Sequence, residues 1–269
     1  DRLGMRTILE GYVFRQLAQR PFTLSFWVRS SLTGTYCVNN FNSGIDTWLI
    51  STFTVDVADT WEKKTIVIPA SLSAGTWDYT NGIGLYFDWI LMAGTDAHGT
   101  AGSWSNTALK RATSAQVNFA ATIGNIFQLA GVQAEDGYTG TDFEDRPFHQ
   151  ELSLCRRYYQ KSFDYGTAPA QSAGVTGASR YRVQIASTTA GYDLHIPLNP
   201  PMRAAPTITY YNPSAANANW RNTTDGADSG AAATSGTIGD SGFTVQNPQA
   251  AGDGAGETIA LHWQASAGL

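Results

Sequence analysis

The chain has 269 residues, of which 42% are hydrophobic and 14% charged, so it can bury a sizeable core and two domains are expected. Its net charge is −5, and its basic residues are scattered mostly singly, which excludes the clustered basic face that a nucleic-acid partner requires. No apolar run approaches the ~20 residues of a membrane span, so no membrane insertion is expected.

Short stretches rich in β-branched and aromatic residues recur between Gly, Asn, Asp and Ser, which predicts an all-β sandwich. In the first stretch, Leu24, Phe26 and Val28 fall on one face of a strand. Trp27 and Arg29 fall on the other, so one face is expected to pack and the other to be free for recognition. The predicted strands of the first half are 22–29, 35–41, 48–55, 61–68, 84–92, 116–119 and 126–133.

One segment has a helical period, with spacings of four, three and four residues that place four side chains on one side. These side chains are Phe148, Leu152, Cys155 and Tyr159. Pro147 stands where a helix would start, and Asp145 could cap it. We therefore predict a jelly-roll domain over 1–146, a short helix and linker over 147–165, and a smaller β-sandwich domain over 166–269.

The second half contains further predicted strands at 180–187, 192–197, 207–211, 242–246 and 258–264. Between 214 and 256 the chain is largely Ala, Gly, Ser, Thr, Asn and Asp, which buries little apolar area per ordered residue. This stretch is expected to form either long mobile loops or a surface that neighbouring chains order.

Cysteine and histidine usage predicts no disulfide, no zinc site and no cofactor. Cys37 and Cys155 could form at most one bridge, and they fall in different predicted modules. Cys155 is expected to be a small buried apolar residue. The four histidines are dispersed and show no ligand spacing.

Two catalytic arrangements can be tested against the sequence. The Gly-Asp-Ser-Gly string at 239–242 matches the nucleophile region of trypsin-like serine proteases, but no upstream histidine motif accompanies Ser241. A glycosidase needs only two facing carboxylates. The candidates for such a pair, Asp78, Asp88, Glu135 and Asp136, are interpreted as edge, loop and turn residues. The chain is therefore not expected to be an enzyme.

Aromatic residues provide the better functional signal, because the C–H faces of sugars stack on flat rings while nearby polar groups bind the hydroxyls. The candidate ligand-binding residues are Trp27 with Arg29 on one predicted strand, Tyr86 with Asp88 on another, and Trp77 and Trp104 in polar loops. The two strands would form one site if their non-core faces meet. Core packing stays open as the alternative for Trp27, Trp77 and Trp104, and it is the expectation for Trp61 and Trp89.

Several segments follow one another in the order found in a jelly-roll domain of tailed-bacteriophage tail fibre and minor tail proteins. That domain is similar to carbohydrate-binding modules. The segments are TLSFWVR at 23–29, GTY at 34–36, TWEKKTIVIP at 60–69, AGT at 93–95, GVQAEDG at 131–137, TDFE at 141–144 and ELSLCRRYY at 151–159. The last is the most specific, and the chain resembles this family over roughly residues 8–165. PMRAAPT at 201–207 resembles the small β domain that often follows.

The resemblance implies a virion protein at the distal tail fibre, often a homotrimer, which contacts other tail proteins and binds a host surface polysaccharide for adsorption. It implies no catalytic residue set. It also implies irregular first strands, because the family usually shows further strands before this point. Jelly rolls of this type often hold a structural calcium ion, for which Glu10, Glu135 and Asp136 are the candidate ligands.

Two other functions stay open. The chain could be a purely structural trimerisation or decoration module of the virion, because a low-charge surface tolerates burial between subunits. That reading predicts that Trp27, Trp77 and Trp104 lie inside subunit contacts. The weaker alternative is a hydrolase of capsule or cell-wall polysaccharide, acting through Asp88 or Glu135.

Overall fold

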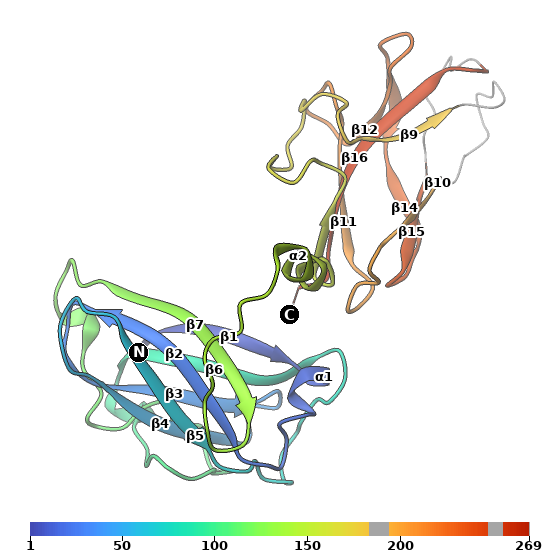
Figure 1. The fold of residues 1–269 in the computed structure, drawn as a ribbon. Coiled ribbons are helices and arrows are strands. Elements are labelled where there is room, and N and C mark those ends of the chain that lie inside the picture. Colours follow the sequence, from blue (N-terminus) through green and yellow to red (C-terminus); the bar gives the residue numbers. More distant parts are fainter. Residues whose placement is uncertain (183–193, 247–254, 269) are drawn as a thin grey trace. The chain divides into compact units, whose positions relative to one another are not determined.

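The structure is a computed structural model that describes residues 1–182, 194–246 and 255–268. The chain divides into two compact units, Asp1–Asp145 and Arg146–Gly268. Strands dominate both units, so the predicted all-β class is confirmed (Figure 1). Within the described residues, no helix is long and apolar enough to cross a membrane.

The first unit is a jelly-roll sandwich of two antiparallel sheets. Its elements are β1 (Arg2–Glu10), α1 (Gly11–Phe14), β2 (Phe22–Ser30), β3 (Gly34–Asn42), β4 (Trp48–Val55), β5 (Glu62–Ile68), β6 (Ile83–Ala93), two 3-10 turns (Thr95–Ala97 and Phe119–Ala121) and β7 (Phe127–Asp136). One sheet has the order β1-β6-β3-β4 and the other β5-β2-β7. The chain crosses between the sheets after β1, β2, β4, β5 and β6, which is the winding of a jelly roll.

The core of the first unit lies between these sheets and follows the alternation predicted for β2. Leu24, Phe26 and Val28 are fully buried, which confirms that face. The Phe26 ring meets the rings of Phe53 and Trp89 edge to face, with centroids 5.1 and 5.6 Å away. Aromatic contacts of this kind stabilise the fold by more than the burial of their apolar area alone would.

The outer face of the four-stranded sheet carries a second apolar cluster. Its buried members are Cys37, Phe41, Trp48, Ile50, Ile90 and Ala112. The long segment between β6 and β7 covers this face, with backbone hydrogen bonds that join Trp48 to Ser105. Strand β3 is therefore buried on both faces, which explains why most of its residues are buried without alternation.

Two features at the ends of the first unit differ from the sequence prediction. Strand β1 was not predicted, and irregular structure was expected there, yet it pairs with β6 along its whole length as an edge strand with mostly exposed residues. Residues 116–119 do not form the predicted strand. The Gln116 side chain instead binds the backbone of Cys37 and Ile90, which fastens the covering segment to the sheet.

The second unit is a smaller sandwich built around one long strand. Its elements are α2 (Phe148–Arg156), β8 (Tyr159–Lys161), β9 (Ser179–Arg182), β10 (Leu194–Pro197), β11 (Thr207–Tyr211), β12 (Asn219–Asn222), β13 (Asp228–Ala232), β14 (Thr234–Ile238), β15 (Gly242–Gln246) and β16 (Thr258–Ser266). A three-stranded sheet, β10-β15-β14, faces a six-stranded sheet in which β16 pairs with β8, β9, β11 and β12. Trp220, Phe243 and Trp263 lie in the core between them.

Three predictions for the second half need correction. Helix α2 ends at Arg156, so Tyr159 leaves the predicted stripe and begins β8, and the predicted linker contributes a strand to the sheet. Cys155 is exposed rather than buried, and both cysteines are free. The polar stretch 214–256 contains β12, β13 and β14, because side chains complete its hydrogen bonding, as when Asn219 donates to the Ser229 carbonyl.

Parts of the predicted strands at 180–187 and 192–197, namely 183–187 and 192–193, lie outside the described residues, as do residues 247–254 of the polar stretch. The strands predicted at 207–211 and 242–246 are confirmed with the same bounds.

A buried histidine makes the stability of the second unit sensitive to pH. The His262 ring stacks on Phe163 with centroids 4.0 Å apart. Its Nε2 donates to the Gly174 carbonyl at 3.0 Å, which leaves Nδ1 to accept from the Ser162 hydroxyl at 2.9 Å. Burial lowers the pKa of His262 from its ordinary value of 6.5.

Because the folded state binds this proton less tightly than the unfolded state, the stabilisation from His262 is complete above the unfolded pKa and is lost as the pH falls below it. We expect the unfolding free energy of the second unit to decrease between about pH 7.5 and pH 5.5. Replacing His262 with Phe should flatten this dependence, although the loss of two hydrogen bonds lowers stability at every pH. Denaturant unfolding at each pH measures the unfolding free energy of the second unit. His149→Gln, at an exposed position of α2, should keep the wild-type slope, and an unchanged slope in His262→Phe would contradict the assignment.

Candidate ligand-binding site

The structure places the six predicted binding residues in three separate groups. Trp27 and Arg29 lie on the outer face of the three-stranded sheet, and Tyr86 and Asp88 lie on the outer face of the four-stranded sheet. The other two tryptophans lie in loops. A sandwich turns its two outer faces away from each other, so the predicted meeting of these two strands does not occur.

Trp27 is the most exposed of the six side chains, with 41% of its surface accessible. A β-bulge between β2 and β7 lies beside it, where the register shifts between Ser25 and Trp27. Gly131 occupies the bulge with a φ of +54°. A Cβ atom at this position would lie 3.2 Å from Cδ1 of Trp27 and 3.6 Å from the Phe143 ring, so the glycine makes room for both rings.

The segment after β7 covers only one part of this face. The Thr23 hydroxyl donates to the Gly137 carbonyl at 2.8 Å. Gly140 packs against Thr23 and Ser25, and both of these outward residues are buried as a result. Phe143 of the same segment lies near the Trp27 ring, yet 41% of the Trp27 surface stays accessible.

Polar side chains are held in place beside the Trp27 ring. Lys63 lies directly across from Trp27 in β5, and its Nζ donates to the Thr141 carbonyl at 3.1 Å. Arg29 donates to the Asp59 carbonyl at 2.8 Å and to the Gln128 side chain at 3.0 Å. An open ring flanked by fixed polar groups is the arrangement that a sugar-binding surface needs.

Trp77 and Trp104 meet each other, but both serve the core. Their rings are in edge-to-face contact at 5.7 Å, and Trp77 stacks on Phe14 at 5.2 Å. The indole N–H of Trp77 donates to the Ala74 carbonyl, and that of Trp104 to the Pro69 carbonyl. Half-buried rings with satisfied N–H groups fit the alternative reading, in which these tryptophans anchor loops to the core.

Asp88 lies in a cluster of cations on the opposite sheet. The residue is 4% exposed, and its Oδ2 accepts from Arg6 at 2.8 Å and from Arg111 at 3.4 Å. The Arg6 guanidinium lies 5.0 Å from the centre of the Tyr86 ring, which stacks on Phe41 at 4.4 Å. The carboxylate predicted to bind a sugar is therefore already engaged by two arginines.

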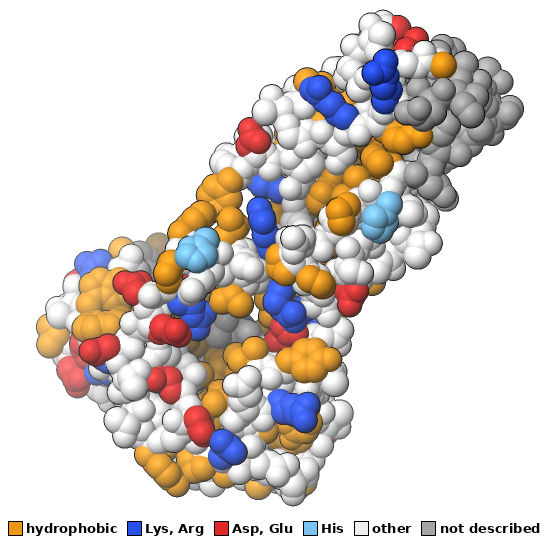
Figure 2. Space-filling view, turned by 45° about the vertical axis from the view of Figure 1, so that its right-hand side comes forward, with side chains coloured by type: hydrophobic (Ala, Val, Ile, Leu, Met, Phe, Trp, Pro, Cys, Tyr) orange, Lys and Arg blue, Asp and Glu red, His pale blue; other side chains and the backbone are white. Residues whose placement is uncertain are grey.

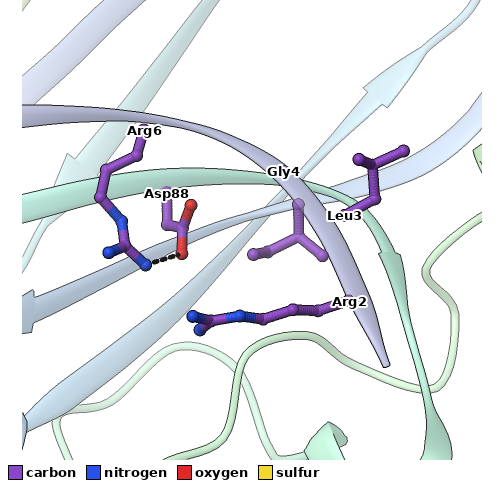
Figure 3. A pocket seen from close by; sticks show the side chains of 6 residues that line it. Arg2, Leu3, Gly4, Arg6 and Asp88 are labelled. Atoms are coloured by element: carbon purple, nitrogen blue, oxygen red, sulfur yellow. Dashed lines mark hydrogen bonds and ion pairs between the residues drawn. The ribbon is translucent and has the colours of Figure 1, made fainter.

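A pocket of about 310 Å³ opens beside this cluster (Figure 3). It is lined by Arg2, Leu3, Gly4, Arg6, Asp88 and Ile90. Figure 3 shows the Arg2 and Arg6 side chains on the same side of β1 as the Asp88 carboxylate. Burial lowers the pKa of Arg111 to about 10, and the charge of Arg2 adds to this effect, yet Arg111 remains positive at neutral pH.

Sequence reasoning missed the three arginines of this cluster. Arg2 and Arg6 lie in a strand that the sequence did not reveal, and Arg111 lies in a loop more than a hundred residues later. Had β1 been recognised, its two-residue alternation would have placed Arg2, Gly4 and Arg6 on one face. No local signal connects Arg111 to them.

The candidate catalytic carboxylates do not face one another. Asp88 lies on the four-stranded sheet, and Glu135 lies on the other sheet, where hydrogen bonds from Thr141 lower its pKa. Asp78 binds Thr80 within a turn. Among the described residues, Ser241 forms no hydrogen bond with a histidine, and its carbonyl accepts from Leu198 in the turn before β15.

Of the predictions for Trp89 and Trp61, one is confirmed and one is wrong. Trp89 is a core residue as expected, but Trp61 is 43% exposed and was wrongly assigned to the core. The three candidate calcium ligands, all within the described residues, form no group that could hold an ion, and Asp136 pairs with Arg20 while Glu135 binds Thr141. Across residues 1–182, 194–246 and 255–268, no group of three or more His, Cys, Asp or Glu side chains could hold a metal ion.

Charged side chains of both signs are mixed on the surface (Figure 2), as the scattered basic residues of the sequence predict. On the face shown in Figure 2, the Lys and Arg side chains of the described residues form no continuous basic stripe, and Asp and Glu side chains lie among them.

No protein-family model matches the chain, and no curated protein matches it. Among solved structures, the chain is similar to the native recombinant discoidin II of Dictyostelium discoideum, with 8% identity, a TM-score of 0.19, and coverage of 93% of this chain and 78% of that chain. It is also similar to wild-type discoidin II of the same organism, with 9% identity, a TM-score of 0.20, and coverage of 93% and 77%. Similarities this low do not indicate what the chain binds.

Proposed function

We propose that the chain is a glycan-binding protein without catalytic activity, and that the open face around Trp27 is its binding surface. The observation that carries this proposal is the exposed indole ring of Trp27 on a strand paired on both sides, with Lys63 and Arg29 held beside it. A sugar can stack on the ring while its hydroxyls bind the neighbouring polar groups. Because both cations are already hydrogen-bonded, little side-chain entropy is lost on binding.

We further propose that this binding serves adsorption to a bacterial surface polysaccharide, with the chain acting as a homotrimer in the tail fibre of a tailed phage. This part rests on the sequence resemblance. Several of the resembling segments coincide with structural elements, since 23–29 lies within β2 and 151–156 lies within α2. The resemblance supplies the biological setting, and the Trp27 face supplies the binding chemistry.

The carboxylates support a role in binding rather than hydrolysis. A glycosidase needs a general acid whose pKa is raised, together with a second carboxylate across the scissile bond. Hydrogen bonds lower the pKa of Glu135, and Asp88 is engaged by two arginines on the opposite sheet. We therefore propose that neither acts as an acid in catalysis.

A purely structural role in the virion is the second candidate. It is favoured by apolar side chains that α2 leaves exposed, since Phe148 and Leu154 are both open to solvent. Such side chains are suited to contacts between subunits. The two roles are compatible, because these residues lie in the second unit and Trp27 lies in the first.

The proposed binding surface predicts that Trp27→Ala weakens glycan binding by about tenfold or more, as loss of a central aromatic contact commonly does. The measurement is binding of the intact 269-residue chain to an array of bacterial surface polysaccharides. Tyr12→Ala is the matched control, because it removes a similarly exposed aromatic ring from α1. Both variants should unfold like the wild type, since exposed residues contribute little to stability. Equal binding by Trp27→Ala and the wild type would refute the assignment of this surface.

A further inference from the structure

We propose that the pocket at the start of β1 is a second binding site, specific for the carboxylate of an acidic sugar such as a uronic acid within a polysaccharide. It lies on the outer face of the four-stranded sheet, whereas Trp27 lies on the outer face of the other sheet. The inference goes beyond the proposed function, because the site is separate and has its own ligand chemistry.

The pocket concentrates positive charge in an acidic protein. Three guanidinium groups, those of Arg2, Arg6 and Arg111, surround one carboxylate, Asp88, while the whole chain carries a net charge of −5. The Arg2 side chain forms no ion pair or hydrogen bond with any described residue. Its charge is therefore available to an anionic group that enters from solvent.

The two other arginines are held in fixed positions before any ligand arrives. The Arg6 guanidinium lies 5.1 Å from the centre of the Phe41 ring and 5.0 Å from that of Tyr86. The buried Arg111 lies with its guanidinium 4.4 Å from the centre of the Phe41 ring. A planar guanidinium that stacks on aromatic rings keeps its N–H groups at the edge of the stack, so those N–H groups of Arg6 that do not bind Asp88 can donate to a ligand carboxylate.

The remaining oxygen of Asp88 argues for a hydroxylated ligand rather than a simple anion. No described residue donates a hydrogen bond to Oδ1 of Asp88. A Cβ atom on Gly4 would lie 3.3 Å from this oxygen, so the absence of a side chain there leaves the oxygen accessible. An acceptor beside three cations matches a ligand that carries both a negative group and hydroxyl donors.

The size and chemistry of the pocket select one acidic monosaccharide unit. Its volume of about 310 Å³ is at the small end of sites for organic ligands. A sulfate ion would bring only acceptor oxygens toward Asp88, whereas a uronic acid presents its carboxylate to Arg2 and Arg6 and a hydroxyl to Asp88. Asp88 thus contributes selectivity by repelling ligands that have no donor.

The test measures calorimetric binding of the full chain to a short oligogalacturonate and to maltohexaose, a neutral oligosaccharide. We expect the oligogalacturonate to bind through the pocket and its affinity to fall as salt is added. Arg2→Gln should weaken this binding about tenfold, because Arg2 is exposed and its loss leaves the fold intact. Arg15→Gln is the matched control, since it removes the same charge beyond the other end of β1, roughly 30 Å away.

Each outcome decides the inference. Equal weakening by Arg2→Gln and Arg15→Gln would reveal attraction by net charge alone and would overturn the site. Full competition by inorganic sulfate at the concentration of the sugar would overturn its selectivity for an acidic sugar. If Trp27→Ala lost oligogalacturonate binding and Arg2→Gln kept it, the ligand would bind on the other sheet. That result would refute the inference, and the proposed function would still stand. Loss in Arg2→Gln, with Trp27→Ala unaffected, would establish the pocket as a site of its own.

Discussion

Replacing Asp88 with Ala should destabilise the first unit by about 3 kcal/mol or more, because it leaves the buried Arg111 without its counter-charge. The side chain of Arg111 is 10% exposed, so water cannot take over the role of the carboxylate. Arg2 and Arg6 lie close enough to add repulsion once the negative charge is gone. Denaturant unfolding of the intact chain, with the transition of the first unit resolved, measures the loss.

Two further variants make this prediction specific. Asp88→Ala combined with Arg111→Met should recover much of the lost stability, because an apolar side chain of similar length no longer requires a partner. Asp136→Ala breaks the ion pair between Asp136 and Arg20. Because both side chains of this pair are more than half exposed, the variant should change stability by less than about 1 kcal/mol. If Asp88→Ala were no more costly than Asp136→Ala, the buried cluster would not be a stabilising unit.

Phe26→Ala should lower the stability of the first unit by about 3 to 5 kcal/mol, which is the usual cost of removing a large aromatic side chain from a core. Phe26 is fully buried, and its ring contacts two other aromatic rings, so the neighbours cannot collapse into the space without losing their own packing. For a unit of this size, we expect the midpoint of thermal unfolding to fall by about 10 °C.

The same variant tests whether the two units are energetically independent. Calorimetry of Phe26→Ala should show a lowered transition for Asp1–Asp145 and an unchanged transition for Arg146–Gly268. Tyr138→Ala, at a position 72% exposed in the same unit, should leave both transitions where they are. A shift of both transitions in Phe26→Ala would contradict independent cores.

The two candidate sites would give the first unit two different sugar specificities on opposite faces. The Trp27 surface depends on stacking, which favours the C–H face of a sugar and is insensitive to salt. The arginine pocket depends on charge, which is screened by salt. Salt titration therefore separates the two contributions in the wild-type chain, before any residue is changed.

Local patterns of the sequence were sufficient for most strands. Alternation in 22–29 identified the buried face of β2, and the bounds of β4, β11 and β15 were predicted as they are observed. These strands have one buried face or a short apolar run between turn residues. The pattern of apolar and polar residues along each strand therefore predicts which side chains are buried. The division of Trp27 and Arg29 from Leu24 and Phe26 follows from the same alternation.

Predictions failed where burial was set by distant parts of the chain. β1 is an edge strand with mostly exposed residues, so it shows no apolar period, and it was not predicted. Trp61 lies just before β5 and is exposed, although tryptophan in an apolar stretch suggested a core position. In the polar stretch 214–256, side-chain hydrogen bonds to the backbone replaced the apolar contacts that the sequence lacked, and strands formed there.

The sequence by itself predicted that this chain is all-β and which face of the strand at 22–29 packs, and it left Trp27 open between recognition and core packing. Only the tertiary structure decided which candidates share a site. It separated Trp27 from Asp88 and joined Asp88 to Arg6 and Arg111 across 82 and 23 residues. The reason is physical: the direction of a side chain follows from local backbone geometry, whereas its neighbours depend on how strands far apart in the chain pair and on which loop covers them.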